Sequence, residues 1–235
     1  KPRLSLNILK SITFFFKKNY IKFITSEKYK WVVQTELMKR NLSKGLSIKS
    51  NNIFSFPIFK DFSLKKPLDK KSNTFLYVCS SSPHKNINRL IKAFNQIKNI
   101  NSKPLHLDLT IDDEIFFKKN ILSKNKNKNL TINNHVNLNE SSLKKLYSQS
   151  KFLIYPSVVE SFGLPLIESL EFNCKIIASQ LPYVNEIVKP SLVFNPFSIS
   201  SISDSIDYAV EKNNIMDSEM LIQNKIDKFI ELIES

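Results

Sequence analysis

The chain reads Pro156-Ser-Val-Val-Glu160-Ser-Phe-Gly163-Leu-Pro165-Leu-Ile-Glu168-Ser-Leu170 directly after the apolar run 151–155. A bounded apolar run of this length is typical of a buried strand. Pro165 suits the first turn of a helix, where a missing N–H leaves no hydrogen bond unmade. Gly163 is one of only two glycines in the chain. The stretch therefore predicts a buried strand, a tight turn and the start of a helix.

The start of a helix is a natural seat for an anion, because its free N–H groups and the positive end of its dipole both favour phosphate. Glu160 in the loop and Glu168 about one turn into the helix would then hold hydroxyl groups on either side of that phosphate. A pair of sugar rings flanking a diphosphate has this layout. The alternative is two ordinary surface acids, which describes most glutamate pairs.

Strand-like and helix-like runs alternate along the chain from residue 74 onward. The strand-like runs are 75–79, 105–111, 135–138, 151–155, 174–179 and 192–194, and the helix-like runs are 86–99, 113–122, 141–150, 163–172, 183–188 and 198–212. This alternation predicts an α/β fold with a Rossmann-like parallel sheet and helices on both faces. A separate helix is predicted over 216–233. Before residue 74, the runs 31–35 and 53–56 predict short strands around a helix at 36–46, and 60–73 predict an exposed linker.

A second loop, Ser80-Ser-Ser-Pro-His84-Lys85-Asn86, follows the first strand of this alternating region. Ligands of such sheets bind beyond the carboxyl ends of the strands, where this loop and the loop 157–162 would both lie. The loop lacks the glycines of a dinucleotide-binding turn. Lys85 would instead neutralise a diphosphate, or lie solvated in the loop. His84 would contact the ligand or water, and Asn86 would cap the next helix.

Charge is concentrated at one end of the chain. Residues 1–71 hold 17 Lys and Arg against 4 Asp and Glu, whereas the remaining residues hold 18 against 17. The candidate site lies in the neutral part, which argues against a nucleic-acid-reading surface. Residues 4–24 mix apolar residues with lysine and predict basic amphipathic helices, which would lie on an anionic membrane surface or pack against a further domain.

The cysteines and histidines argue against a disulfide-rich protein and against a Cys/His metal-binding protein. Cys79 and Cys174 lie in apolar strand-like runs, so they predict buried thiols in a reducing compartment rather than a disulfide framework. No Cys/His spacing typical of a metal site is present. No apolar run reaches transmembrane length, and the N-terminus lacks the pattern of a signal peptide.

The two loops and their surroundings resemble the nucleotide-sugar-binding half of the retaining glycosyltransferases of family 4, also called group 1, which have the GT-B fold. The resemblance covers most of residues 74–213 and is carried by segments 75–94, 142–148, 154–168 and 177–186. A Glu-x7-Glu pattern alone is a weak signal. Embedded in Pro-Ser-x-x-Glu-Ser-Phe-Gly-Leu-Pro, and preceded by a Pro-x-Lys-Asn turn, it is strong.

The resemblance implies a role for each site residue. Glu160 would be the catalytic residue beside the donor sugar, as a nucleophile or as a stabiliser of a cationic sugar, and Glu168 would accept hydrogen bonds from the ribose. The diphosphate and the rest of the donor would be bound by Lys85, His84, Ser161, Phe162, Gly163 and Leu164. The resemblance implies no metal and no other cofactor. Many members carry an arginine where this chain has Ser80, so Arg89 or His84 would have to take its place.

The resemblance also implies a domain organisation and a biological setting. Residues 1–72 would be the tail of the acceptor-side domain, 73–213 the donor-binding domain, and 214–235 a helix packing back toward the first part. The partners would be a UDP- or GDP-sugar and a glycan or lipid-linked acceptor, in the synthesis of O-antigen or capsule. The protein would be cytoplasmic, or peripheral at the inner face of the membrane through residues 1–71, and would bind no nucleic acid.

Three other functions stay open from the sequence. The chain would be a donor-binding module without transfer activity if it lacks half of the cleft. It would be a basic peripheral membrane or nucleic-acid protein if residues 1–71 dominate its behaviour. A nucleotide-sugar epimerase on a similar fold is the remaining enzyme alternative.

Overall fold

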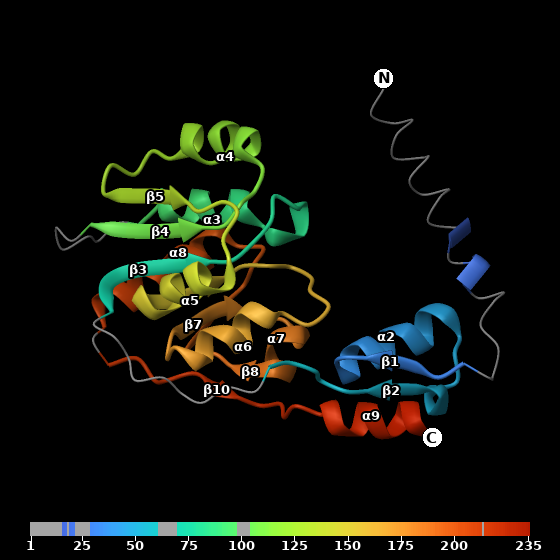
Figure 1. Cartoon of the computed structure of the whole chain (residues 1–235). Helices are drawn as coiled ribbons and strands as arrows, with labels where there is room; N and C mark the ends of the chain where they lie inside the picture. The colour runs from blue at the N-terminus through green and yellow to red at the C-terminus, as the bar shows by residue number, and fades with distance from the viewer. Residues whose placement is uncertain (1–15, 18, 22–28, 61–69, 98–103, 213) are drawn as a thin grey trace. The chain divides into compact units, whose positions relative to one another are not determined.

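The computed structural model describes residues 16–17, 19–21, 29–60, 70–97, 104–212 and 214–235 (Figure 1). The chain divides into two compact units, Lys1–Phe59 with Gln223–Ser235, and Lys60–Ile222. The amphipathic helices predicted over 4–24 lie almost wholly outside the described residues. Among the residues that are described, no helix is long and apolar enough to span a bilayer.

The smaller unit is a short parallel pair of strands with helices. Its elements are β1 (Trp31–Val33), α2 (Glu36–Leu46), the 3₁₀ turn η1 (Ser50–Asn52), β2 (Ile53–Ser55) and α9 (Ile226–Glu234). Thr35 starts α2 by accepting a hydrogen bond from the Met38 N–H, as a helix cap does. Val33 of β1 and Ile53 of β2 are both buried and form the core of this unit with Ile48. The strands at 31–35 and 53–56 and the helix at 36–46 are therefore confirmed within one or two residues.

The larger unit contains the alternating region. Its elements are β3 (Lys71–Tyr77), η2 (Pro83–Lys85), α3 (Ile87–Phe94), β4 (Leu105–Leu109), α4 (Glu114–Asn120), η3 (Leu122–Lys124), β5 (Leu130–Asn134), α5 (Glu140–Gln149), β6 (Ser150–Tyr155), α6 (Leu164–Glu171), β7 (Lys175–Ser179), α7 (Pro182–Ile187), β8 (Val188–Lys189), β9 (Leu192–Phe194), α8 (Ile199–Glu211) and β10 (Glu219–Met220). In the described part of this unit, six strands form a sheet in the order β5-β4-β3-β6-β7-β9. Every pairing in that sheet is parallel. The predicted α/β class with a Rossmann-like parallel sheet is confirmed.

Helices cover both faces of the sheet, with α3 and α8 packed together on one face and α5 and α6 on the other (Figure 1). Phe75 in the centre of β3 packs on Phe152 of β6 and on Phe94 of α3, with ring centroids 5.0 and 5.4 Å apart. The strand order reverses between β3 and β6, so the chain leaves these two neighbours toward opposite faces. A crevice forms at such a switch point, beyond the carboxyl ends of the strands.

Three sequence expectations are wrong in detail. Residues 135–138 form a loop, with Asn137 at a positive φ of 52°, and the strand is β5 immediately before them. The run 216–233 is not one helix but contains β10, which pairs with β8, and then α9. The linker predicted over 60–73 ends earlier, because β3 begins at Lys71.

Candidate functional site

The loop after β3 turns sharply before α3 begins. Pro83–Lys85 form the 3₁₀ turn η2, and Asn86 follows with a left-handed φ of 58°. Asn86 is the N-cap residue of α3, as the sequence predicts, although its side chain makes no capping hydrogen bond. Its amide instead donates to the carbonyl oxygens of Pro156 and Pro196, at 3.1 and 2.8 Å. Asn86 thus joins the β3 loop to the loops that follow β6 and β9.

Two further contacts hold the β3 loop against the β6 loop. The Val158 N–H donates to the His84 carbonyl at 2.9 Å. The buried Tyr77 hydroxyl lies 2.8 Å from both the Lys85 carbonyl and the Ser157 hydroxyl. A carbonyl can only accept, so the tyrosine proton points to Lys85 and the Ser157 hydroxyl donates to Tyr77. The backbone around Lys85 is therefore fixed relative to the start of the β6 loop.

The joined loops bring Lys85 and Glu160 together. The Lys85 Nζ lies 2.6 Å from the Glu160 Oε1, and the two side chains are only 15% and 11% exposed. The Lys85 Nζ also lies 6.0 Å from the centroid of the Tyr155 ring, a cation–π distance. Residues 75 positions apart in the chain thus share one partly buried site at the switch point of the sheet.

Three buried tyrosines, Tyr77, Tyr155 and Tyr183, pack together beside the Lys85–Glu160 ion pair. The ring of Tyr155 packs edge-on against Tyr77 and Tyr183, with centroids 5.8 and 6.4 Å away. The Tyr183 hydroxyl donates to the Ser157 carbonyl at 2.7 Å. Burial, with the nearby Glu160 carboxylate, raises the pKa of both Tyr155 and Tyr183. Both phenols therefore stay neutral across the physiological pH range, and the charge at the site belongs to Lys85 and Glu160.

The start of α6 lies close to Tyr155, because a Cβ added to Gly163 would be 3.6 Å from the Tyr155 hydroxyl. Gly163 precedes the helix with a φ of 86°, and no side chain caps the helix within the described residues. Pro165 has no N–H and the Leu166 N–H donates to the Gly163 carbonyl at 2.9 Å, so an anion at this helix start would meet the Leu164 N–H and the positive end of the helix dipole. Glu168 is the fifth residue of α6, and its Oε2 accepts a hydrogen bond from the Tyr147 hydroxyl at 2.8 Å. Asn173 ends the turn after α6 with a φ of 54°, a left-handed conformation that asparagine adopts more readily than most residues.

The left-handed turn at Gly163 makes this position sensitive to substitution. A Cβ added to Gly163 would lie 3.2 Å from Leu166 Cδ1, on a backbone that L side chains rarely adopt. We expect Gly163→Ala to lower the free energy of unfolding by about 1–2 kcal/mol, measured by urea denaturation.

Gly45→Ala is the matched control, because Gly45 lies within α2 and its Cβ would meet nothing within 4 Å. The control should be up to about 1 kcal/mol more stable than wild type. Equal stability of the two variants would contradict the argument.

The remaining predicted residues contribute in different ways. His84 belongs to η2, and its carbonyl holds the β6 loop. Ser161 and Leu164 are exposed, whereas the Phe162 side chain is buried, so Phe162 can offer only its backbone to a ligand. Ser80 bonds to Ser82 within its own loop. Arg89, expected to replace a missing arginine, donates to the Asn86 side chain at 2.9 Å and lies over the Phe197 ring.

Cys79 and Cys174 are buried free thiols, as the sequence predicts, and burial raises the pKa of each. Among the described residues, no group of three or more His, Cys, Asp or Glu side chains could hold a metal ion.

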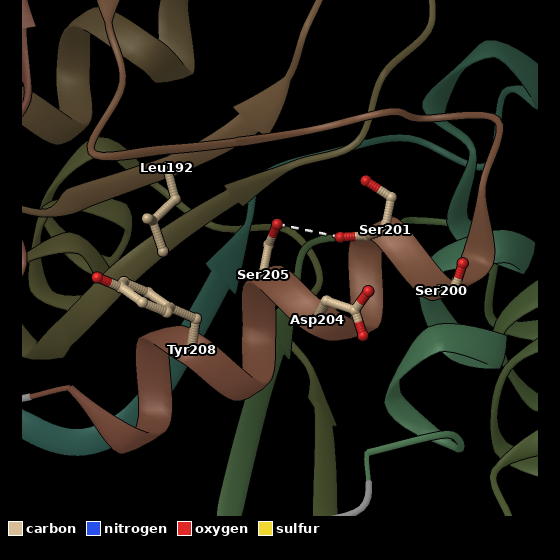
Figure 2. A pocket seen from close by; sticks show the side chains of 6 residues that line it. All are labelled: Leu192, Ser200, Ser201, Asp204, Ser205 and Tyr208. Atoms are coloured by element: carbon tan, nitrogen blue, oxygen red, sulfur yellow. Dashed lines mark hydrogen bonds between the residues drawn. The ribbon is translucent and has the colours of Figure 1, made fainter.

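A separate hollow of about 340 Å³ lies along α8. Figure 2 shows Leu192 of β9 beside hydroxyl and carboxylate side chains of the helix, where the Ser205 hydroxyl donates to the Ser201 carbonyl at 3.0 Å. The hollow is lined by Leu192, Ser200, Ser201, Asp204, Ser205 and Tyr208. None of these residues is a predicted site residue, so the hollow is distinct from the Lys85–Glu160 site.

Comparison with known proteins identifies the family. The family model described as glycosyl transferases group 1 matches residues 59–228. The chain belongs to this family. The match spans both loops of the site, including Lys85, Glu160 and Glu168. A Salmonella typhimurium protein named O-antigen chain mannosyltransferase RfbU is 30% identical to this group 1 chain over 193 residues, which are 77% of this chain and 52% of that protein.

Two solved structures share the fold of this chain. The Anabaena protein HepE, solved in complex with UDP and glucose, has a TM-score of 0.64 and 12% identity, and the match covers 84% of this chain and 57% of HepE. A glycosyltransferase from Rickettsia africae has a TM-score of 0.62 and 18% identity, over 82% of this chain and 56% of that one. The chain spans about half the length of RfbU and of these two proteins.

The sequence alone does not predict the residues that hold the site together. Tyr77, Tyr147, Ser157 and Tyr183 all lie in the segments that carry the family resemblance, but no sequence pattern gives them a role. A hydroxyl at the carboxyl end of a buried strand, as in Tyr77, is a signal that could have been used, because a buried hydroxyl needs a partner.

Proposed function

We propose that the protein transfers a sugar from a nucleotide-diphosphate-sugar to a glycan or lipid-linked acceptor, with retention of anomeric configuration as in family 4. The observation that carries the proposal is the Lys85–Glu160 pair, enclosed by two joined loops at the switch point of the sheet. The name of the relative RfbU supports O-antigen or a similar surface polysaccharide as the product.

In the proposed reaction, the bond between the anomeric carbon and the diphosphate oxygen breaks, and negative charge develops on the diphosphate. The acceptor hydroxyl oxygen forms the new bond to the anomeric carbon, and its proton leaves with the diphosphate. Lys85 and the uncapped start of α6 stabilise that charge electrostatically. Glu160 lies beside the donor sugar, where it acts as a nucleophile or stabilises a cationic sugar. The backbone from Ser161 to Leu164 binds the sugar and phosphate, and Glu168 accepts hydrogen bonds from the ribose.

The proposal extends to the setting of the protein. Residues 73–213 bind the donor, 1–72 belong to the acceptor side, and 214–235 return to that side. The excess of positive charge in residues 1–71 supports a peripheral location at the inner, cytoplasmic face of a membrane.

A second candidate function is donor binding without transfer, because the chain spans 52% of the length of RfbU. Calorimetry with UDP- and GDP-sugars, paired with a transfer assay on a lipid-linked acceptor, separates the two. Binding with turnover supports the transferase, and NMR of the product's anomeric proton then tests retention. Binding without turnover supports the second candidate, and no binding of either nucleotide sugar contradicts both.

A further inference from the structure

Glu168 is held in place by a buried tyrosine from another helix. Tyr147 lies in the last turn of α5, and its side chain is 1% exposed. Its hydroxyl donates to the Glu168 Oε2 at 2.8 Å. Within the described residues, no hydrogen bond reaches the other carboxylate oxygen, Oε1. One oxygen of Glu168 is therefore fixed by the protein, and the other remains able to accept from a ligand.

The ring of Tyr147 is fixed independently of its hydroxyl. It stacks on Phe172, with centroids 5.8 Å apart and an angle of 6° between the ring planes. Glu168 of α6 and Phe172, the residue that ends this helix, are four positions apart and therefore lie on the same side of it. Tyr147 thus lies alongside α6, with its ring stacked on Phe172 and its hydroxyl hydrogen-bonded to Glu168. Replacing tyrosine by phenylalanine would remove the hydroxyl and leave this stacking in place.

The electrostatic environment keeps the hydroxyl a donor. Burial, with the Glu168 carboxylate beside it, raises the pKa of Tyr147 far above physiological pH. A neutral phenol that donates to a carboxylate makes a charge-assisted hydrogen bond, stronger than one between neutral groups. The carboxylate is thereby restrained in one orientation before any ligand arrives.

We propose that Tyr147 is a positioning residue, which orients Glu168 so that its free carboxylate oxygen meets the ribose hydroxyls of the nucleotide. The inference rests on the proposed function, because it assigns a ribose to the ligand of Glu168. It adds a residue of α5 to a site otherwise built by the β3 and β6 loops and by α6.

The test compares nucleoside diphosphate binding by wild type, Tyr147→Phe and the control Tyr208→Phe. Tyr208 is 47% exposed on α8 and lies outside the site. Calorimetry measures the affinity for UDP and GDP, and for the 2′,3′-dideoxy form of whichever nucleotide binds. We expect Tyr147→Phe to weaken binding of the ribonucleotide about tenfold, the loss typical of one hydrogen bond to a charged group. Affinity for the dideoxy nucleotide should be unchanged, and Tyr208→Phe should match wild type with both.

A double variant separates positioning from packing. In a Glu168→Gln background, adding Tyr147→Phe should change ribonucleotide affinity less than twofold. The inference is overturned if Tyr147→Phe binds the ribonucleotide as wild type does, or if it loses affinity equally for the ribo and dideoxy nucleotides. If the wild-type chain binds neither UDP nor GDP, the proposed function itself fails, which is a different result from either of these.

Discussion

Lys85→Met slows sugar transfer by about 10²- to 10³-fold, the loss typical of removing one preorganised group that stabilises transition-state charge. Methionine keeps the length and packing of the lysine stem but removes the cation that would face the departing diphosphate. The substitution also leaves the Glu160 carboxylate, 11% exposed, without its partner at 2.6 Å. Repulsion between that carboxylate and the diphosphate would then add to the loss. Initial rates with saturating acceptor measure the effect.

The matched control for this variant is Lys118→Met. Lys118 is 71% exposed on α4 and pairs with Glu114 one helical turn away, so it offers the same chemical change outside the site. The control should transfer sugar at the wild-type rate. Equal rates for Lys85→Met and Lys118→Met would show that Lys85 has no part in the reaction.

Glu160→Gln separates catalysis from binding. We expect transfer to fall by about 10²-fold or more, because the neutral amide can neither attack the anomeric carbon nor stabilise positive charge on the sugar. Affinity for the nucleoside diphosphate should rise about three- to tenfold, because Lys85 no longer has a carboxylate that competes with the phosphates. Calorimetry with UDP and GDP, alongside the rate assay, gives both numbers.

Glu140→Gln is the control for this second variant. Glu140 is 67% exposed at the start of α5 and pairs with Lys144 and Lys60. Neither its transfer rate nor its nucleotide affinity should change. A Glu160→Gln variant that loses nucleotide affinity would mean that the Glu160 carboxylate supports Lys85 rather than competing for it.

The order of elements in the larger unit could be predicted from sequence because its strands are short, apolar and separated by clear helices. The strand β5 begins five residues before the predicted run 135–138, because its segment Leu130–Asn134 holds only two apolar residues and lies in a stretch rich in Asn and Lys. The strand β10 was missed because it is exposed and has only two residues. Its β structure depends on pairing with β8, a tertiary contact that no local pattern records.

Only part of the site could be predicted, because local features can be read from the sequence and tertiary contacts cannot. The loops that carry Lys85 and Glu160 were recognisable because strand ends, turn residues and the helix start are local features. The hydrogen bond between Tyr77 and Ser157 joins residues 80 positions apart, and the bond between Tyr147 and Glu168 joins α5 to α6. Such bonds depend on strand register and helix packing, so their geometry emerges only in the folded chain.

The most direct test of a diphosphate site between Lys85 and the start of α6 is calorimetric titration of the chain with UDP and GDP, for wild type and Lys85→Met. We predict that wild type binds one of the two nucleotides with 1:1 stoichiometry, and that Lys85→Met binds it at least tenfold more weakly. Equal affinity of the two proteins for that nucleotide, or no binding by wild type, would contradict the account.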